Sequence, residues 1–307
     1  MLPRIDLVSS STSYFGTPAE TLDPLIFPGG EAMPMSSWIR STLLASLFAA
    51  TEKKFHNPEV WATVWLAGSG ASYLWSSQRA PRDLDVLVGV DYVEFRQANP
   101  GYQGLTDHEI SASLNELWRE TLQPKMDNWQ GQWEVTFYSN PGASDIRTIH
   151  PYAAYNLTTD GWDVEPQRTP AYHTRAGDLQ AVRDYQDADK ILTRYKHAVD
   201  AVRQNRHPIA LEQAERTIKE SLDQAAAMFE SIHGGRHLAF GPGGQGFLDP
   251  ANYRWQAGKA SGVVGALKSL KDYRDARNER QTVETYGVDL PATDVLIRRA
   301  AEWRANR

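Results

Sequence analysis

The stretch GSGASYLWSSQRAPRDLDVLV, residues 68–88, decides the fold because it joins the end of one predicted strand to the start of the next. The segment EVWATVWLAG (59–68) is rich in β-branched and aromatic residues, which favours a buried strand. Gly68-Ser69-Gly70 interrupts it. A second strand is predicted over residues 83–90.

Two aspartates, Asp83 and Asp85, share one face of the second strand because successive strand residues point to opposite faces. The apolar residues between and after them face the core. Carboxylates this close repel one another unless a cation neutralises them. With no Cys and no paired His nearby, all-oxygen ligation favours Mg²⁺ or Mn²⁺. The alternative is a purely structural pairing of these aspartates with Arg79 or Arg82.

Ser69 stands where the first strand ends and a short helix through Tyr73 and Leu74 is expected to begin. A helix N-terminus presents free N–H groups and the positive end of the helix dipole. The sequence therefore predicts a phosphate-binding site at Gly68 and Ser69.

Length and composition bound the class of protein. A chain of 307 residues predicts two domains. The net charge is −6, and it is unevenly distributed, because the N-terminal half is acidic and the C-terminal half is slightly basic. The absence of Cys excludes disulfides, Cys-ligated zinc, iron–sulfur clusters and thiol nucleophiles. No stretch resembles a signal peptide or a membrane span, so no membrane partner and a cytoplasmic location are expected.

The pattern of elements predicts an α+β fold. Residues 1–35 are expected to form an extended arm, 36–175 a small mixed β-sheet domain with flanking helices, and 176–307 an α-helical bundle domain. Between two helices of the bundle, 233–259 is predicted to be a long loop. The other expected elements are helices at 38–54, 107–122, 179–204, 210–233, 260–273 and 292–304, strands at 132–139 and 146–149, and a hairpin over 155–164.

Gly68-Ser69, thirteen intervening residues and then Asp83-Leu84-Asp85 resemble the signature of the nucleotidyltransferase superfamily related to DNA polymerase β. The resemblance covers roughly residues 36–165. It implies that the aspartates bind two divalent ions carrying a nucleoside triphosphate, and that Ser69 holds a phosphate oxygen. The implied reaction moves a nucleoside monophosphate to a hydroxyl, on an RNA 3′ end, a small molecule or a protein, and releases pyrophosphate.

The same resemblance implies a third carboxylate on a neighbouring strand, which completes the metal site and assists deprotonation of the acceptor. Glu134 is favoured because it shares the polar face of its predicted strand with Thr136. Asp145 is the alternative, at the start of another predicted strand but on the same face as Arg147. The family more often has Asp than Glu at this position.

Basic residues of related two-domain enzymes reach the triphosphate from the helical part, although no motif fixes which ones do so here. The candidates are Lys190 and Arg194, on the first helix after the sheet domain, and Arg254 and Lys259, near the aromatic run at 253–255. The glycine-rich segment 241–246 lacks the Lys and Ser/Thr of a P-loop and is expected to be a flexible loop or a lid. His150, His173, His197 and His233 are interpreted as structural residues without ligand spacing.

Two other functions remain open at this point. Metal-dependent glycosyltransferases that use nucleotide sugars also carry Asp-x-Asp on a strand, although they lack the Gly-Ser turn shortly before it. A catalytically silent nucleotide-binding module is the third hypothesis, and the presence of both Asp83 and Asp85 argues against it.

Overall fold

The computed structural model describes residues 5–7, 19–73, 77, 83–167, 175–204, 207–241 and 243–287, with 295–296, 299–300 and 303 near the C-terminus. The chain divides into two compact units. The sheet unit contains the described parts of 19–167 together with 240–247. The helical unit contains 175–239 and 248–287, and residues 5–7 belong with it.

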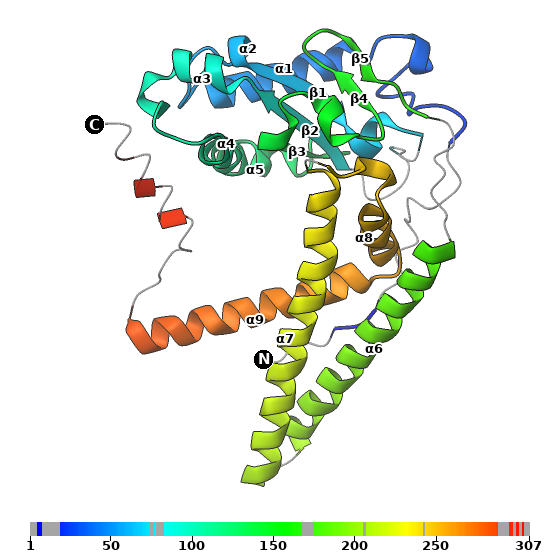
Figure 1. The fold of residues 1–307 in the computed structure, drawn as a ribbon, viewed down its shortest axis with the longest axis vertical. Coiled ribbons are helices and arrows are strands. Elements are labelled where there is room, and N and C mark those ends of the chain that lie inside the picture. The colour runs from blue at the N-terminus through cyan, green and yellow to red at the C-terminus, as the bar shows by residue number, and fades with distance from the viewer. Residues whose placement is uncertain are drawn as a thin grey trace. The chain divides into compact units, whose positions relative to one another are not determined.

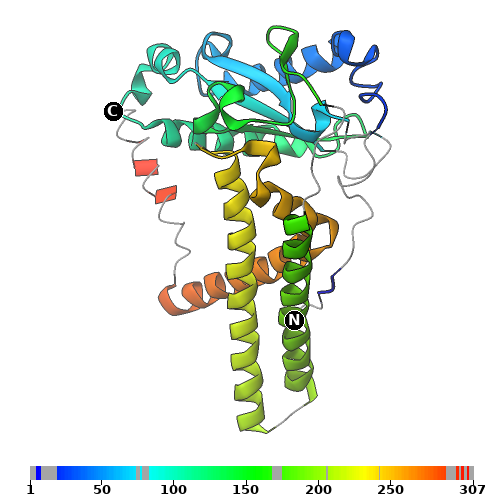
Figure 2. The ribbon, with the colours of Figure 1, turned by 45° about the vertical axis from the view of Figure 1, so that its right-hand side comes forward.

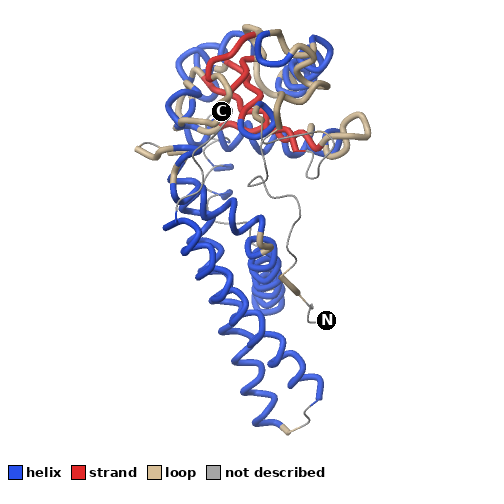
Figure 3. Tube along the Cα trace, turned by 90° about the vertical axis from the view of Figure 1, so that its right-hand side faces the viewer, coloured by secondary structure: helices blue, strands red, loops and turns tan. Residues whose placement is uncertain are grey.

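The sheet unit is built on a five-stranded mixed sheet in the order β3-β2-β1-β4-β5. Strand β2 pairs antiparallel with β1 and parallel with β3. All described strands lie in this unit (Figure 3). Their bounds are β1 Ala62–Ala67, β2 Asp83–Val90, β3 Glu134–Ser139, β4 Ala154–Asn156 and β5 Gly161–Val164.

Five α-helices accompany the sheet (Figure 1): α1 Ser37–Thr51, α2 Pro58–Trp61, α3 Tyr92–Ala98, α4 Asp107–Thr121 and α5 Gln123–Met126. Helix α4 begins at the predicted capping box, in which Thr106 accepts from the Glu109 N–H and the Glu109 carboxylate accepts from the Thr106 N–H. It packs on β3 and α1. The parallel β2–β3 pair requires this long crossover, because parallel neighbours cannot be joined by a tight turn.

Residues 19–35 pack against the sheet unit. Leu22, Ile26 and Phe27 are fully buried there, and the Phe27 ring stacks on Trp162 at a centroid distance of 5.0 Å. The Tyr155 hydroxyl accepts from the Met35 N–H at 3.0 Å. This part of the predicted arm therefore contributes to the core of the sheet unit.

The helical unit consists of α6 Arg175–Gln204, α7 Pro208–Ala239, α8 Pro250–Ala260 and α9 Val263–Tyr286. Helices α6 and α7 lie side by side over much of their length (Figure 2). Their apolar faces share one core with α8 and α9, centred on fully buried Tyr195, Ala225 and Leu267. No helix in the described ranges has the length and apolar character that crossing a membrane requires.

The structure corrects several predicted elements. The first residues of the 59–68 strand form α2, and 146–149 is a 3₁₀ turn because the Asp145 side chain accepts from the Arg147 N–H and caps it. The predicted loop 233–259 is largely helical, since α7 continues to Ala239 and α8 begins at Pro250. Most of the predicted helix 292–304 lies outside the described residues.

Residues 246 and 247 contact residues 149–152, which precede strand β4. The Phe247 N–H donates to the His150 carbonyl at 3.0 Å, and the Phe247 ring packs on Tyr152 at 4.5 Å. Gly246 has a φ of 61°, and a Cβ there would lie 2.0 Å from the His150 oxygen. The end of the predicted flexible loop, at Gly246, thus lies against the backbone of residues 149 and 150.

We therefore predict that Gly246→Ala destabilises the protein. The new Cβ would clash with the His150 carbonyl oxygen, and alanine is strained in the left-handed backbone conformation of this position. We expect a loss of about 2–4 kcal/mol in the free energy of unfolding. Gly243→Ala is the matched control, since Gly243 also has a positive φ but a Cβ there would meet no atom within 4 Å. Urea denaturation of both variants checks the difference. Equal losses would contradict the packing of this segment.

Candidate functional site

Three carboxylates lie on one face of the sheet where β2 and β3 begin. Asp83 pairs in register with Glu134, and Asp85 pairs with Thr136. In-register residues of parallel neighbours project to the same face, about 4.8 Å apart. Asp83 and Asp85 are partly exposed and Glu134 is exposed, whereas Leu84 on the opposite face is fully buried. The parallel register therefore brings Glu134 beside the aspartate pair.

The glycine-serine turn lies at the same end of the sheet. Ala67, the last residue of β1, is the register partner of Asp85, so the chain enters the turn directly beside that carboxylate. Gly68 has a φ of 69°, and a Cβ on it would lie 3.7 Å from Asp85 Oδ2. The left-handed backbone favours glycine at this position. The Asp85 carboxylate is thus adjacent to the Gly68-Ser69 backbone.

The turn is a four-residue 3₁₀ helix, Gly68–Ala71, and the backbone returns to an extended conformation at Ser72. Ser72 donates to the Ser69 carbonyl through both its N–H, at 2.9 Å, and its hydroxyl, at 2.7 Å. Leu74, part of the predicted helix, lies outside the described residues. A turn this short lacks the summed dipole of a full helix. The predicted phosphate contact therefore depends on the local N–H groups and the Ser69 hydroxyl.

Asp145 lies far from this group. The Ser144 carbonyl, one residue before it, is 2.8 Å from where a Cβ of Gly89 would stand. Gly89 is four residues beyond Asp85 on β2, about 13 Å along the strand. The Asp145 carboxylate also accepts from the Arg147 N–H and pairs with its guanidinium at 3.5 Å. Geometry therefore favours Glu134 over Asp145 as the third carboxylate.

The donor set at Asp83, Asp85 and Glu134 consists of carboxylate oxygens, which suits Mg²⁺ or Mn²⁺. In the part of the chain that the structure describes, no group of three or more His, Cys, Asp or Glu side chains is arranged to hold a metal ion, so Asp83, Asp85 and Glu134 do not form a three-ligand site by themselves. Magnesium is commonly held by one or two carboxylates together with substrate phosphates and water. The residues present fit that mode of binding, in which substrate supplies part of the coordination.

The Gly68–Ala71 turn contacts the residues that precede β4. The Gly68 N–H donates to the Ala153 carbonyl at 3.2 Å, and Tyr152 precedes it with its ring on Phe247. Burial, with a smaller contribution from Tyr73, raises the pKa of Tyr152 to about 12. This phenol stays protonated at neutral pH and is packed as a structural support of the turn.

Four basic residues predicted to contact the triphosphate belong to the helical unit. The Arg254 guanidinium donates to both carboxylate oxygens of Asp184, at 2.6 and 2.8 Å, and to Ser231 Oγ at 3.0 Å. Through these hydrogen bonds Arg254 links α8 to α6 and α7. Lys259 lies in the last turn of α8.

Lys190 and Arg194 border an open groove of about 700 Å³ between α6 and α7. Lys190 pairs with Asp187 at 2.9 Å, and Arg194 donates to the side chain of Gln224. His197 and Asp189 line the same groove, together with small and hydroxyl-bearing residues. Two basic side chains, Lys190 and Arg194, and one acidic side chain, Asp189, thus line the groove.

His233, interpreted as structural, packs against the rings of Phe229 and Trp255 and also contacts a second histidine. His237 follows four residues later on α7, and the two Nε2 atoms lie 3.2 Å apart. The i,i+4 spacing was present in the sequence as a signal. His150 has a backbone role, since its carbonyl accepts from Phe247, and His173 lies outside the described residues.

Comparison with protein-family models, curated proteins and solved structures finds no match to this chain.

Proposed function

We propose that the protein is a metal-dependent nucleotidyltransferase that moves a nucleoside monophosphate from an NTP to a hydroxyl and releases pyrophosphate. The observation that carries the proposal is the register of β2 with β3. It sets Glu134 beside Asp83, while the antiparallel β1–β2 pair sets Ala67, and with it the start of the glycine turn at Gly68, beside Asp85. A carboxylate group and a glycine turn thus share one end of the sheet, as the resemblance to the superfamily implies.

Each residue has a defined role in this proposal. Asp83 and Asp85 hold Mg²⁺ or Mn²⁺, which when bound neutralises the phosphates and stabilises the leaving pyrophosphate. The turn backbone and the Ser69 hydroxyl donate hydrogen bonds to a phosphate oxygen. Glu134 accepts the proton of the attacking hydroxyl or orients that hydroxyl for in-line attack. The α-phosphorus–oxygen bond to pyrophosphate breaks as the bond to the acceptor oxygen forms.

The test is incubation of the full chain with each labelled NTP, Mg²⁺ or Mn²⁺, and three separate acceptor pools: total RNA, a metabolite extract and the protein itself. Label transfer with pyrophosphate release supports the proposal and identifies the acceptor class. Transfer from nucleotide sugars alone would favour the glycosyltransferase. Binding of NTP without turnover in any pool would favour the silent module.

The third carboxylate has its own prediction. We expect Glu134→Gln to reduce the transfer rate by about 10²-fold, because a positioned proton acceptor contributes about 10²–10⁴-fold. Asp145→Asn, at the far end of β2, is expected to leave the rate unchanged. Single-turnover rates at saturating NTP measure both. A large loss for Asp145→Asn with normal activity for Glu134→Gln would reverse the assignment.

A further inference from the structure

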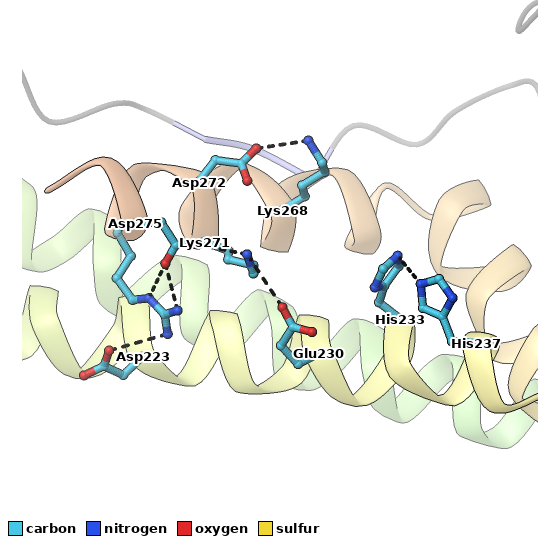
Figure 4. Close-up of polar contacts among 9 residues, drawn as sticks. Asp223, Glu230, His233, His237, Lys268, Lys271, Asp272 and Asp275 are labelled. Atoms are coloured by element: carbon cyan, nitrogen blue, oxygen red, sulfur yellow. Dashed lines mark hydrogen bonds and ion pairs between the residues drawn. The ribbon is translucent and has the colours of Figure 1, made fainter. Parts of the chain in front are cut away.

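Two histidines face each other near the C-terminal end of α7. His233 is half-buried and His237 is exposed, one helical turn later. Their Nε2 atoms are 3.2 Å apart and their ring centroids 4.4 Å apart (Figure 4). We propose that His233 and His237 form a bidentate site for a divalent transition-metal ion such as Zn²⁺. This site is separate from the carboxylates Asp83 and Asp85 and does not depend on the proposed function.

The separation of the two nitrogens matches the bite of a chelate. Zinc binds imidazole nitrogen at about 2.0–2.1 Å with tetrahedral angles, which places two ligating nitrogens about 3.3 Å apart. The observed Nε2 separation is 3.2 Å. One ion can therefore contact both nitrogens without a change in backbone conformation. Histidines at i and i+4 on one helix face are a known arrangement for such chelation.

The environment holds His233 in place before any ion binds. Its ring stacks on Phe229 at 5.2 Å with an interplanar angle of 17°, and the Trp255 ring is 5.3 Å away. Such packing fixes the direction of Nε2 and limits the entropy lost on binding.

The surrounding charges define how many ligands the protein supplies. Glu230, one turn before His233, pairs with Lys271 of α9 at 3.6 Å, and Lys268 pairs with Asp272 at 3.0 Å (Figure 4). The Arg236 guanidinium lies over the Trp255 ring at 5.1 Å. The two imidazoles are thus the protein ligands of the proposed ion, and water molecules would fill its remaining coordination positions. Imidazole nitrogens select Zn²⁺, Cu²⁺ or Ni²⁺ over Mg²⁺.

The experiment is calorimetric titration of the full chain with Zn²⁺ at pH 7.5. Its background carries Asp83→Asn and Asp85→Asn, so that ions at those carboxylates do not contribute. We expect one equivalent of Zn²⁺ to bind, and His237→Gln to weaken binding by about tenfold or more. His237 is exposed, so its replacement leaves the core intact. His108→Gln, on the exposed first turn of α4, is the matched control and is expected to bind normally.

A second measurement covers His233→Gln, which also alters packing against Phe229 and Trp255. Zn²⁺ is expected to raise the Tm of the background protein and of His108→Gln, but not of His237→Gln or His233→Gln. The proposal is overturned if the background protein binds no Zn²⁺ up to millimolar concentration, or if His237→Gln binds it equally well. The pair would then be a hydrogen bond between two imidazoles, one donating and one accepting.

Discussion

Replacing both strand aspartates, Asp83→Asn with Asp85→Asn, is expected to reduce label transfer from NTP by at least about 10²–10³-fold. Asparagine keeps the size and the hydrogen-bonding oxygen of each side chain but removes the negative charge that holds a divalent ion. The two substituted side chains are half-buried, and the buried Leu84 between them is unchanged, so the strand is expected to form normally. Transfer is measured with the acceptor pool that proves active for the unmodified chain.

Asp127→Asn is the control for this loss. Asp127 is exposed beyond α5, where it accepts from the Gln123 side chain at 2.6 Å, and its charge lies outside the proposed site. Circular dichroism and Tm show whether each variant is folded. Undiminished transfer by the folded double variant would rule out the metal-binding role of the two aspartates. Recovery of part of the rate by excess Mn²⁺ would support it.

Arg254→Met is expected to lower the free energy of unfolding by about 3–5 kcal/mol. The Asp184 side chain is only 7% exposed, and the guanidinium contacts both of its oxygens. Removing the guanidinium leaves a buried carboxylate without its cation, which costs more than the pair itself contributes. Chemical denaturation followed by far-UV circular dichroism measures the loss.

Lys190→Met is the matched control, because the Lys190–Asp187 pair is exposed and is expected to contribute less than about 1 kcal/mol. Combining Arg254→Met with Asp184→Leu is expected to restore much of the lost stability, since an apolar pair can replace a buried ion pair. If Arg254→Met instead raised KM for NTP with little loss of stability, Arg254 would be a triphosphate ligand rather than a support of the helical unit.

Local patterns predicted much of the fold. The alternation in 83–90 identified β2, the capping box at Thr106 identified the start of α4, and Asp160-Gly161 identified the β4–β5 turn. Each depends on residues close together in sequence. The parallel register of β2 with β3 has no such local signal, because it depends on how α3 and α4 pack during the crossover.

The errors also have particular physical causes. Gly234-Gly235 looked like the end of a helix, yet α7 continues through both residues, and a Cβ on Gly235 would lie 3.4 Å from the Ala251 side chain of α8. Here glycine permits close helix packing rather than a turn. Ile146 and Ile149 looked like strand residues, but their spacing of three fits the turn that Asp145 caps.

The candidate site was predictable in part. Asp83 and Asp85 followed from strand alternation, and Glu134 from the resemblance together with its polar face. The break at Gly68 was predicted, but the expected helix through Tyr73 is instead a four-residue 3₁₀ turn that ends at Ala71. His237 follows His233 by four residues, a spacing that places both side chains on one face of a helix.

The crossover between β2 and β3 also bears on how the chain folds. Strands β1 and β2 are separated by residues 68–82, whereas β2 and β3 are separated by residues 91–133. Closing the longer segment costs more chain entropy, so the antiparallel pair has the smaller barrier to formation. Two aspartates and the glycine turn then assemble from nearby sequence, and Glu134 joins them only when α3 and α4 are in place. A nascent chain that ends before residue 134 contains both aspartates and the glycine turn but not Glu134, the residue proposed to activate the acceptor.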